Sequence, residues 1–191
     1  MEPRPNTMQE PAVEGQSLMK HAVRWGAILG GIGIVLTLLC YAIDYSLLAD
    51  WKFGLIMIVL FIGLVIYGGI NYRNQAGGYL SYGKAFQHGY VSLLVSGVIG
   101  TLFSILLYTV VDPDLPQNLS DVSVEKTEAM MRSFGAPEEA IEQQMDELRT
   151  SMPERFSAMG LIKQFGWNLI VFAVVSVITA LFVKKNEPEV M

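Results

Sequence analysis

Residues 86–111 read FQHGYVSLLVSGVIGTLFSILLYTVV, an apolar run that contains no Asp, Glu, Lys or Arg. A straight α-helix of this length measures about 39 Å, which is more than the roughly 30 Å of hydrocarbon in a bilayer. Three other uncharged apolar segments are long enough to cross a bilayer, and they cover residues 25–43, 53–70 and 165–183. The sequence therefore predicts an all-α fold, an integral membrane bundle of four membrane-spanning helices.

The composition of the chain agrees with this fold class. Of its 191 residues, 52% are hydrophobic and only 16% are charged, whereas a soluble domain carries about 25% charged residues. Residues 25–185 are predicted to form one membrane domain, because too little sequence remains for a second. Residues 1–24 are rich in Pro, Glu and Gln and predict a flexible tail, and residues 186–191 form a short C-terminal tail.

Basic residues gather in three regions that a four-span topology places on one side of the membrane. They precede the first span, occupy the connection between the second and third spans, and follow the fourth span: Lys20, Arg24, Arg73, Lys84, Lys184 and Lys185. Short loops that carry Lys and Arg are retained in the cytoplasm. Both termini are therefore expected in the cytoplasm. Residues 112–164, with eleven acids and five bases, are expected on the outer side.

Small residues recur every four positions in the third span and at the start of the first. The candidate helix-packing stripes are Ser92, Ser96, Gly100 and Ser104, and Gly26 with Gly30. One interpretation places them at helix contacts, within the bundle or between protomers, since small side chains let membrane helices approach closely. The other is a polar path with His88 at its mouth. The packing interpretation is favoured because a path normally needs ionisable groups at mid-depth, and none is found there. His88 is then expected at the interface or in a hydrogen bond between helices.

Residues 118–152 are predicted to form an acidic helical hairpin outside the membrane, between the third and fourth spans. Pro113 ends the third span, and Gly135 takes the position of a helix C-terminal cap. Pro137 begins the second helix of the hairpin, and Pro153 is expected to interrupt it.

An apolar stripe with helical spacing follows the second helix of this hairpin. Its members are Ile141, Met145, Leu148 and Met152. The stripe must be covered. Either the two hairpin helices pack on each other or on the ends of the bundle, or the stripe is a docking surface for a partner, with methionines as adaptable contacts.

Residues 77–89 read GGYLSYGKAFQHG and fit the pattern G-G-x-x-S-[FY]-G-x-A-F-x-x-G at the entrance to a membrane helix. With the layout of residues 20–186, this motif resembles the bacterial family called domain of unknown function 4199, found largely in Bacteroidota. Members are short proteins with four predicted spans and a Glu/Lys-rich helical segment before the last. The resemblance implies an integral protein of a bacterial inner membrane, and it supplies no activity, ligand or catalytic residue.

The motif itself predicts a structural role. Gly77, Gly78 and Gly83 suit a tight turn with unusual backbone angles. Ser81 is expected to cap the helix that begins nearby.

No residue pattern predicts catalysis, a metal site or a cofactor. The sequence has no His/Cys cluster with metal spacing, no glycine loop for nucleotides and no nucleophile elbow. The expected partners are the lipid bilayer and either a second copy of the chain or another membrane protein, and no nucleic acid is expected. The expected function is a non-catalytic scaffold, regulator or sensor that acts through the outer hairpin. The alternative is a small oligomeric transporter or channel component.

Overall fold

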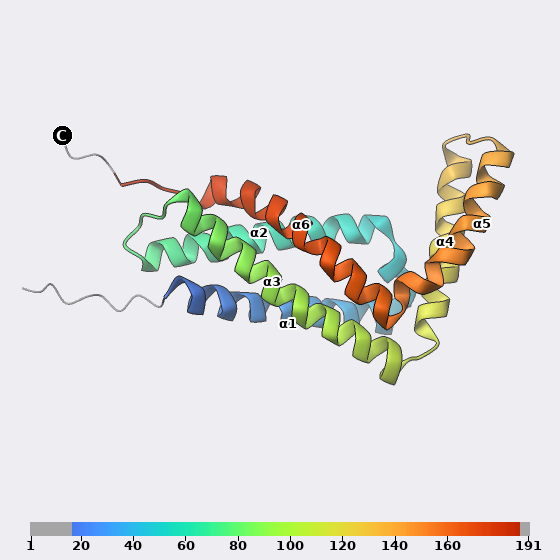
Figure 1. Cartoon of the computed structure of the whole chain (residues 1–191), viewed down its shortest axis with the longest axis horizontal. Coiled ribbons are helices and arrows are strands. Elements are labelled where there is room, and N and C mark those ends of the chain that lie inside the picture. The colour runs from blue at the N-terminus through green and yellow to red at the C-terminus, as the bar shows by residue number, and fades with distance from the viewer. Residues whose placement is uncertain (1–16, 188–191) are drawn as a thin grey trace, which may run out of the picture.

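Four long helices lie side by side in the computed structural model, which describes residues 17–187 (Figure 1). In chain order they are α1 (Leu18–Asp44), α2 (Trp51–Gln75), α3 (Tyr82–Leu106) and α6 (Ala158–Val183). α1 runs on into a short 3-10 helix, η1 (Tyr45–Ala49), and α3 runs on into a π-helical turn, η2 (Leu107–Val111). All four are long and apolar enough to cross a membrane, and residues 17–187 contain no strand. The prediction of an all-α fold with four spans is confirmed.

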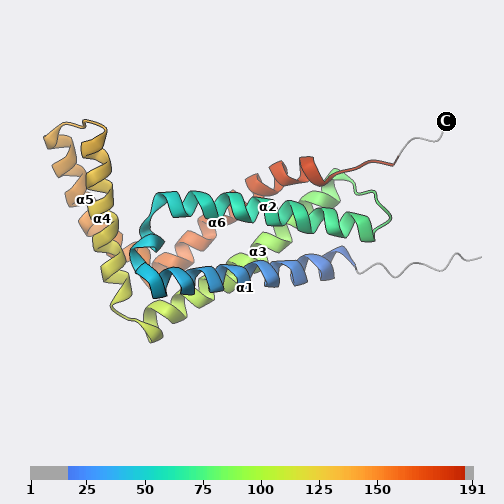
Figure 2. The ribbon, with the colours of Figure 1, turned by 180° about the vertical axis from the view of Figure 1, so that it is seen from behind.

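The two remaining helices, α4 (Leu115–Ser133) and α5 (Glu138–Phe156), form a hairpin at one end of the bundle. Figures 1 and 2 show it standing at a steep angle to the bundle, at the end opposite to the start of α1 and the end of α6. The turn η2 ends at Val111, and its C-cap residue Asp112 directly precedes Pro113, as predicted. Gly135 has a φ of +73° between the two helices, which glycine adopts at little cost.

Pro153 does not interrupt α5 as predicted, because the helix continues past it to Phe156. A proline is most costly in the interior of a helix, where it removes a hydrogen bond and meets the preceding turn. Pro153 has no amide to bond to the preceding turn of α5, but Phe156 packs against the apolar cluster at the end of the bundle, and this contact keeps the last turn helical. Ser157 then begins α6, and its Oγ accepts a hydrogen bond from the Gly160 amide at 3.0 Å.

The first helix begins before the first apolar segment. α1 starts at Leu18, and the Oγ of Ser17 accepts from the Lys20 amide at 3.4 Å. The prediction of a flexible tail is therefore wrong for residues 18–24, which are helical. The reason is tertiary packing, since His21 and Ala22 are buried among the neighbouring helices. The rest of that predicted tail, residues 1–16, and residues 188–191 lie outside the described residues.

The connection between α2 and α3 holds the glycine motif. Gly77 and Gly78 have φ values of +92° and +87°, as expected for a tight turn. Gly83 instead lies in the first turn of α3 without a positive φ, so its predicted unusual angle is wrong. Ser81 occupies the N-cap position of α3, but its side chain makes no capping hydrogen bond.

Candidate functional site

The glycine stripe of α1 lies against α3. A Cβ at Gly26 would lie 2.6 Å from the Ser92 carbonyl oxygen and 2.7 Å from the Val95 Cβ. A Cβ at Gly30 would lie 2.9 Å from the Ile99 Cβ. Because real side chains do not approach so closely, this contact between the two helices requires glycine at both positions.

The serine stripe of α3 divides into two parts. Ser92 and Ser96 are buried, and the Ser92 hydroxyl bonds to the carbonyl oxygens of His88, at 2.8 Å, and Ala22, at 3.1 Å. Ser92 therefore lies at the contact between α3 and α1.

Gly100 and Ser104 instead line a cavity of about 250 Å³ inside the bundle. Nothing lies within 4 Å of a Cβ placed on Gly100. Ser96 and Thr37 add hydroxyl groups to the wall, and none of the described residues that line this cavity has an ionisable side chain. The structure thus places Ser92 at a helix contact, and Ser96, Gly100 and Ser104 at the cavity.

The two histidines form a buried pair between α1 and α3. His21 Nδ1 lies 2.9 Å from His88 Nε2, and His21 Nε2 lies 3.3 Å from Oδ1 of Asn71 on α2. The Gln75 amide also donates to Asn71 Oδ1, at 2.7 Å. Because this oxygen is an acceptor, the neutral pair has one consistent arrangement: His21 Nε2 donates to Asn71, and His88 Nε2 donates to His21 Nδ1. The hydrogen bond expected of His88 therefore joins helices, and the chain of bonds connects α1, α2 and α3.

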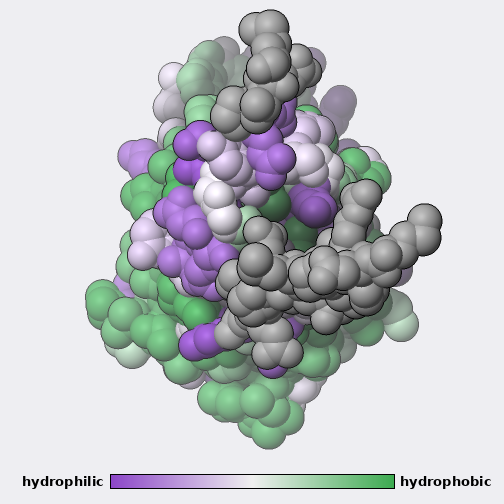
Figure 3. All heavy atoms as spheres, turned by 90° about the vertical axis from the view of Figure 1, so that its left-hand side faces the viewer, coloured by the Kyte–Doolittle hydropathy of each residue, from purple (hydrophilic) through white to green (hydrophobic). Residues whose placement is uncertain are grey.

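Aromatic rings and a small cavity surround this pair. The Tyr72 ring stacks on His88 with centroids 5.5 Å apart, and Trp25 stacks on His21 at 6.3 Å. A cavity of about 280 Å³ lies beside His21 and is also lined by Arg24 and Asn71. The pair lies near the start of α1. Figure 3 looks onto the end of the bundle where α1 begins and α6 ends, and hydrophilic residues (purple) gather there among hydrophobic ones (green). Within residues 17–187 no group of three His, Cys, Asp or Glu residues that could hold a metal ion occurs.

The apolar stripe of α5 lies inside the hairpin. Ile141 and Met145 are only 2% and 3% exposed and pack with Val124 of α4, and Leu148 and Met152 are partly buried in the same cluster. Of the two explanations for the stripe, packing between the hairpin helices is therefore the one observed. A docking surface made of Ile141 and Met145 is wrong, since α4 already covers them.

An apolar cluster attaches the hairpin to the bundle. Leu107, the first residue of η2, packs with Leu115 and Leu119 of α4. Tyr41 of α1 and Phe156 of α5 pack against these three leucines. The base of the hairpin therefore shares its core with the bundle.

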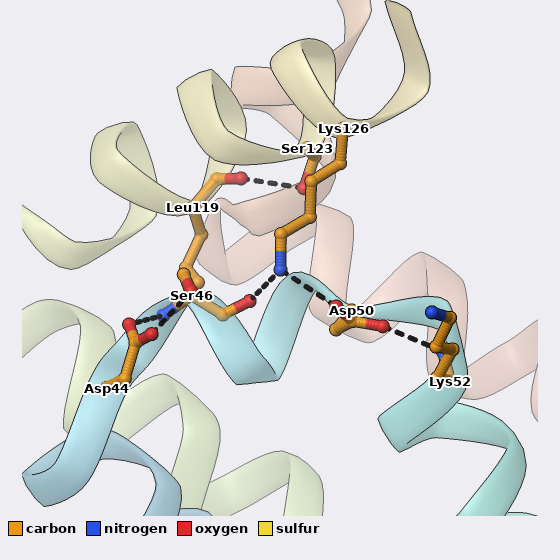
Figure 4. A network of polar contacts seen from close by, with 7 residues as sticks. All are labelled: Asp44, Ser46, Asp50, Lys52, Leu119, Ser123 and Lys126. Carbon is orange, nitrogen blue, oxygen red and sulfur yellow. Dashed lines mark hydrogen bonds and ion pairs between the residues drawn. The ribbon is translucent and has the colours of Figure 1, made fainter. Parts of the chain in front are cut away.

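One lysine adds a polar tether to this attachment (Figure 4). Lys126 of α4 donates to the Ser46 carbonyl oxygen at 2.7 Å and pairs with Asp50 at 3.1 Å. A hydrogen bond from the Lys52 amide and that from Lys126 hold the pKa of Asp50 below its ordinary value. The tether joins the middle of α4 to the connection between α1 and α2.

The tip of the hairpin is held by charge and exposes an aromatic ring. Arg132 pairs with Glu128 at 3.0 Å and with Glu138 across the turn at 2.7 Å. The hydrogen bonds from Arg132 lower the pKa of Glu138. Phe134 lies two residues after Arg132, and its side chain is 82% exposed.

The side of α5 that faces away from α4 is acidic. Glu139, Glu142 and Asp146 recur at steps of three and four residues, so they form one stripe. All three are exposed. None of them makes an ion pair with another described residue. We call these three residues the acidic face.

Two contacts were not predicted from the sequence: the pair of His21 with His88, and the ion pair of Lys126 with Asp50. A signal for the first was present, because Ala22, Gly26 and Gly30 share a spacing of four residues and extend the packing stripe back into the predicted tail. No sequence pattern distinguishes Lys126 from other lysines on polar helices, so its contact with Asp50 could not be predicted.

These features define a multi-pass helical membrane protein whose extramembrane hairpin is firmly attached to one end of its bundle. The chain belongs to the family described as protein of unknown function DUF4199, whose sequence model matches residues 24–185. The match covers nearly all of the four long helices and the whole hairpin, and it confirms the resemblance seen in the motif. Neither the search of curated proteins nor that of solved structures returned a match.

Proposed function

We propose that the protein is a non-catalytic scaffold, regulator or sensor that binds a partner protein with a basic surface. The binding element is the hairpin, and the contact surface is the acidic face of α5. The observation that carries this proposal is the set of three exposed carboxylates at Glu139, Glu142 and Asp146, which form no ion pair within residues 17–187, on a helix whose apolar side is already buried.

The attachment of the hairpin supports this role. A surface fixed before binding loses less conformational entropy when the partner arrives. The apolar cluster around Leu115 and the tether from Lys126 to Asp50 both fix α4 relative to the bundle. α5 is in turn fixed on α4 through Ile141 and Met145.

Charge determines the kind of partner. Complementary potentials raise association rates and exclude partners of like charge. A surface rich in Lys and Arg suits the acidic face, and the exposed Phe134 ring at the hairpin tip supplies an apolar anchor of the kind enriched at interfaces.

The transport alternative has less support. Transport paths in membrane proteins place ionisable side chains toward the bundle interior or a water-filled cavity. The described residues that line the cavity at Ser96, Gly100 and Ser104 contribute hydroxyl and apolar groups only. We therefore assign the function to the hairpin.

We further propose that the protein lies in a bacterial inner membrane with both termini in the cytoplasm. The distribution of charge supports the orientation. The bundle end where α1 begins and α6 ends also holds the connection between α2 and α3, residues 71–85, which carries Arg73 and Lys84 and no acidic residue, whereas the hairpin end carries the excess of acidic residues. Positive loops are retained on the cytoplasmic side.

Site-specific photo-cross-linking in native membranes tests the function. We expect a photoreactive residue at Gln143, beside the acidic face, to give one discrete protein adduct in the full chain. Charge reversal by Glu139→Lys, Glu142→Lys and Asp146→Lys should lower the adduct yield about tenfold or more, because like charges then oppose each other. High salt should lower the yield in the same direction.

The control places the photoreactive residue at Val59, an exposed apolar position on α2. Its adducts should not respond to the triple charge reversal. A Gln143 adduct whose yield is unchanged by charge reversal, with the variant still folded, would contradict the proposed partner surface.

A further inference from the structure

We propose that the junction between α5 and α6 binds one anionic phospholipid, with its phosphate beside Arg155 and Lys163 and an acyl chain along α6. A cavity of about 540 Å³ lies at this junction. Residues of three helices line it, among them Ser123, Ser151, Arg155, Phe156, Lys163 and Trp167. Its volume lies within the roughly 300–1,000 Å³ typical of ligand pockets.

The junction lies where the fourth apolar segment begins. α6 starts at Ala158, but its uncharged apolar part starts only at residue 165. Lys163 comes just before this boundary and Trp167 just after it, four residues apart and hence on the same side of the helix. Trp167 is 69% exposed, and tryptophan prefers the level of the lipid headgroups. The cavity therefore opens at headgroup level.

The charges around the cavity favour an anion. Lys163 pairs with Glu154 at 2.6 Å, and both side chains are exposed. Arg155 lines the same cavity and makes no ion pair with another described residue. Two cations and one carboxylate leave a single positive charge, which one phosphodiester neutralises. The guanidinium fork of Arg155 matches two phosphate oxygens.

An apolar track leads away from this cavity. Val171, Val174 and Ile178 are exposed and continue the side of α6 that carries Trp167, at helical spacing. A free phosphate makes no use of such a track, whereas an acyl chain lies along it in the bilayer. Headgroup and tail contacts are therefore continuous, which identifies the occupant as a phospholipid.

Native mass spectrometry of the full-length protein, titrated with phosphatidylglycerol in detergent, tests this site. We expect one phosphatidylglycerol to bind more tightly than phosphatidylcholine. Arg155→Gln should weaken this binding about tenfold or more, since it removes a charge-assisted hydrogen bond. Arg149→Gln is the matched control on the same helix and should leave the affinity unchanged. If Arg155→Gln does not fold, Lys163→Gln serves in its place, with the same expected direction.

Two results would overturn the proposal. One is equal affinity for phosphatidylglycerol in the wild type and in the folded Arg155→Gln or Lys163→Gln variant. The other is displacement of the lipid by glycerol 1-phosphate at comparable concentration, which would assign the cavity to a soluble phosphate. The proposed partner surface lies on another side of α5, so neither result bears on it.

Discussion

Gly26→Val is expected to separate α1 from α3 and to prevent stable folding of the bundle. Even the Cβ of the new side chain would lie 2.6 Å from the Ser92 carbonyl oxygen, which belongs to the backbone of α3 and cannot rotate away. Overpacking a tight contact costs about 1–3 kcal/mol and occasionally more. Valine adds two methyl groups beyond the Cβ, so a loss of about 3 kcal/mol or more is expected. Thermal unfolding in detergent, with size-exclusion chromatography, measures it.

Gly31→Val is the matched control for this prediction. Gly31 lies on the same helix, and nothing lies within 4 Å of a Cβ placed there. Its thermal midpoint should stay close to that of the wild type, because replacing glycine inside a helix carries little cost by itself. Equal midpoints for the two variants would contradict the packing of α1 on α3 through Gly26.

His88→Leu is expected to destabilise the end of the bundle where α1 begins. His88 is fully buried and its Nε2 lies 2.9 Å from His21 Nδ1. Leucine fills the space but leaves the His21 nitrogen without its partner, which costs about 1–3 kcal/mol for a buried polar group. Gln87→Leu, one position earlier and exposed, is the control and should change the thermal midpoint little.

A double-mutant cycle isolates the contribution of the histidine pair. If His21 and His88 bond to each other, His88→Leu should cost less in a His21→Leu background than in the wild type. Strictly additive effects of the two substitutions on the free energy of unfolding would argue that the pair does not interact.

The four spans were predictable because the bilayer imposes a simple requirement. A helix that crosses hydrocarbon must hide its backbone polar groups and carry few charges over about 20 residues. The segment 86–111 meets this requirement without any tertiary information. The turn of the hairpin was predictable for a similar local reason, since Gly135 and Pro137 restrict the backbone by themselves.

The predictions that failed or stayed open concern residues whose structure depends on contacts between helices and not on local backbone preference. Pro153 breaks isolated helices, yet the contact of Phe156 with the bundle keeps the last turn of α5 in place. Ile141 and Met145 form an apolar stripe whether α4 or a partner covers it, so the sequence leaves both explanations open. The bond between His21 and His88 joins two helices far apart in the chain, and no local pattern encodes such a pairing.

The proposed partner on the outer side of the membrane can reach the acidic face only if the hairpin lies across the membrane from both termini. Cysteine labelling in spheroplasts tests this most directly, with the buried Cys40 replaced by alanine and a single new cysteine at Ala76 or Gln143. Both positions are exposed. We predict that a membrane-impermeant maleimide labels Gln143→Cys in intact spheroplasts and labels Ala76→Cys only after lysis. Labelling of both cysteines, or of Ala76→Cys alone, before lysis would contradict the account.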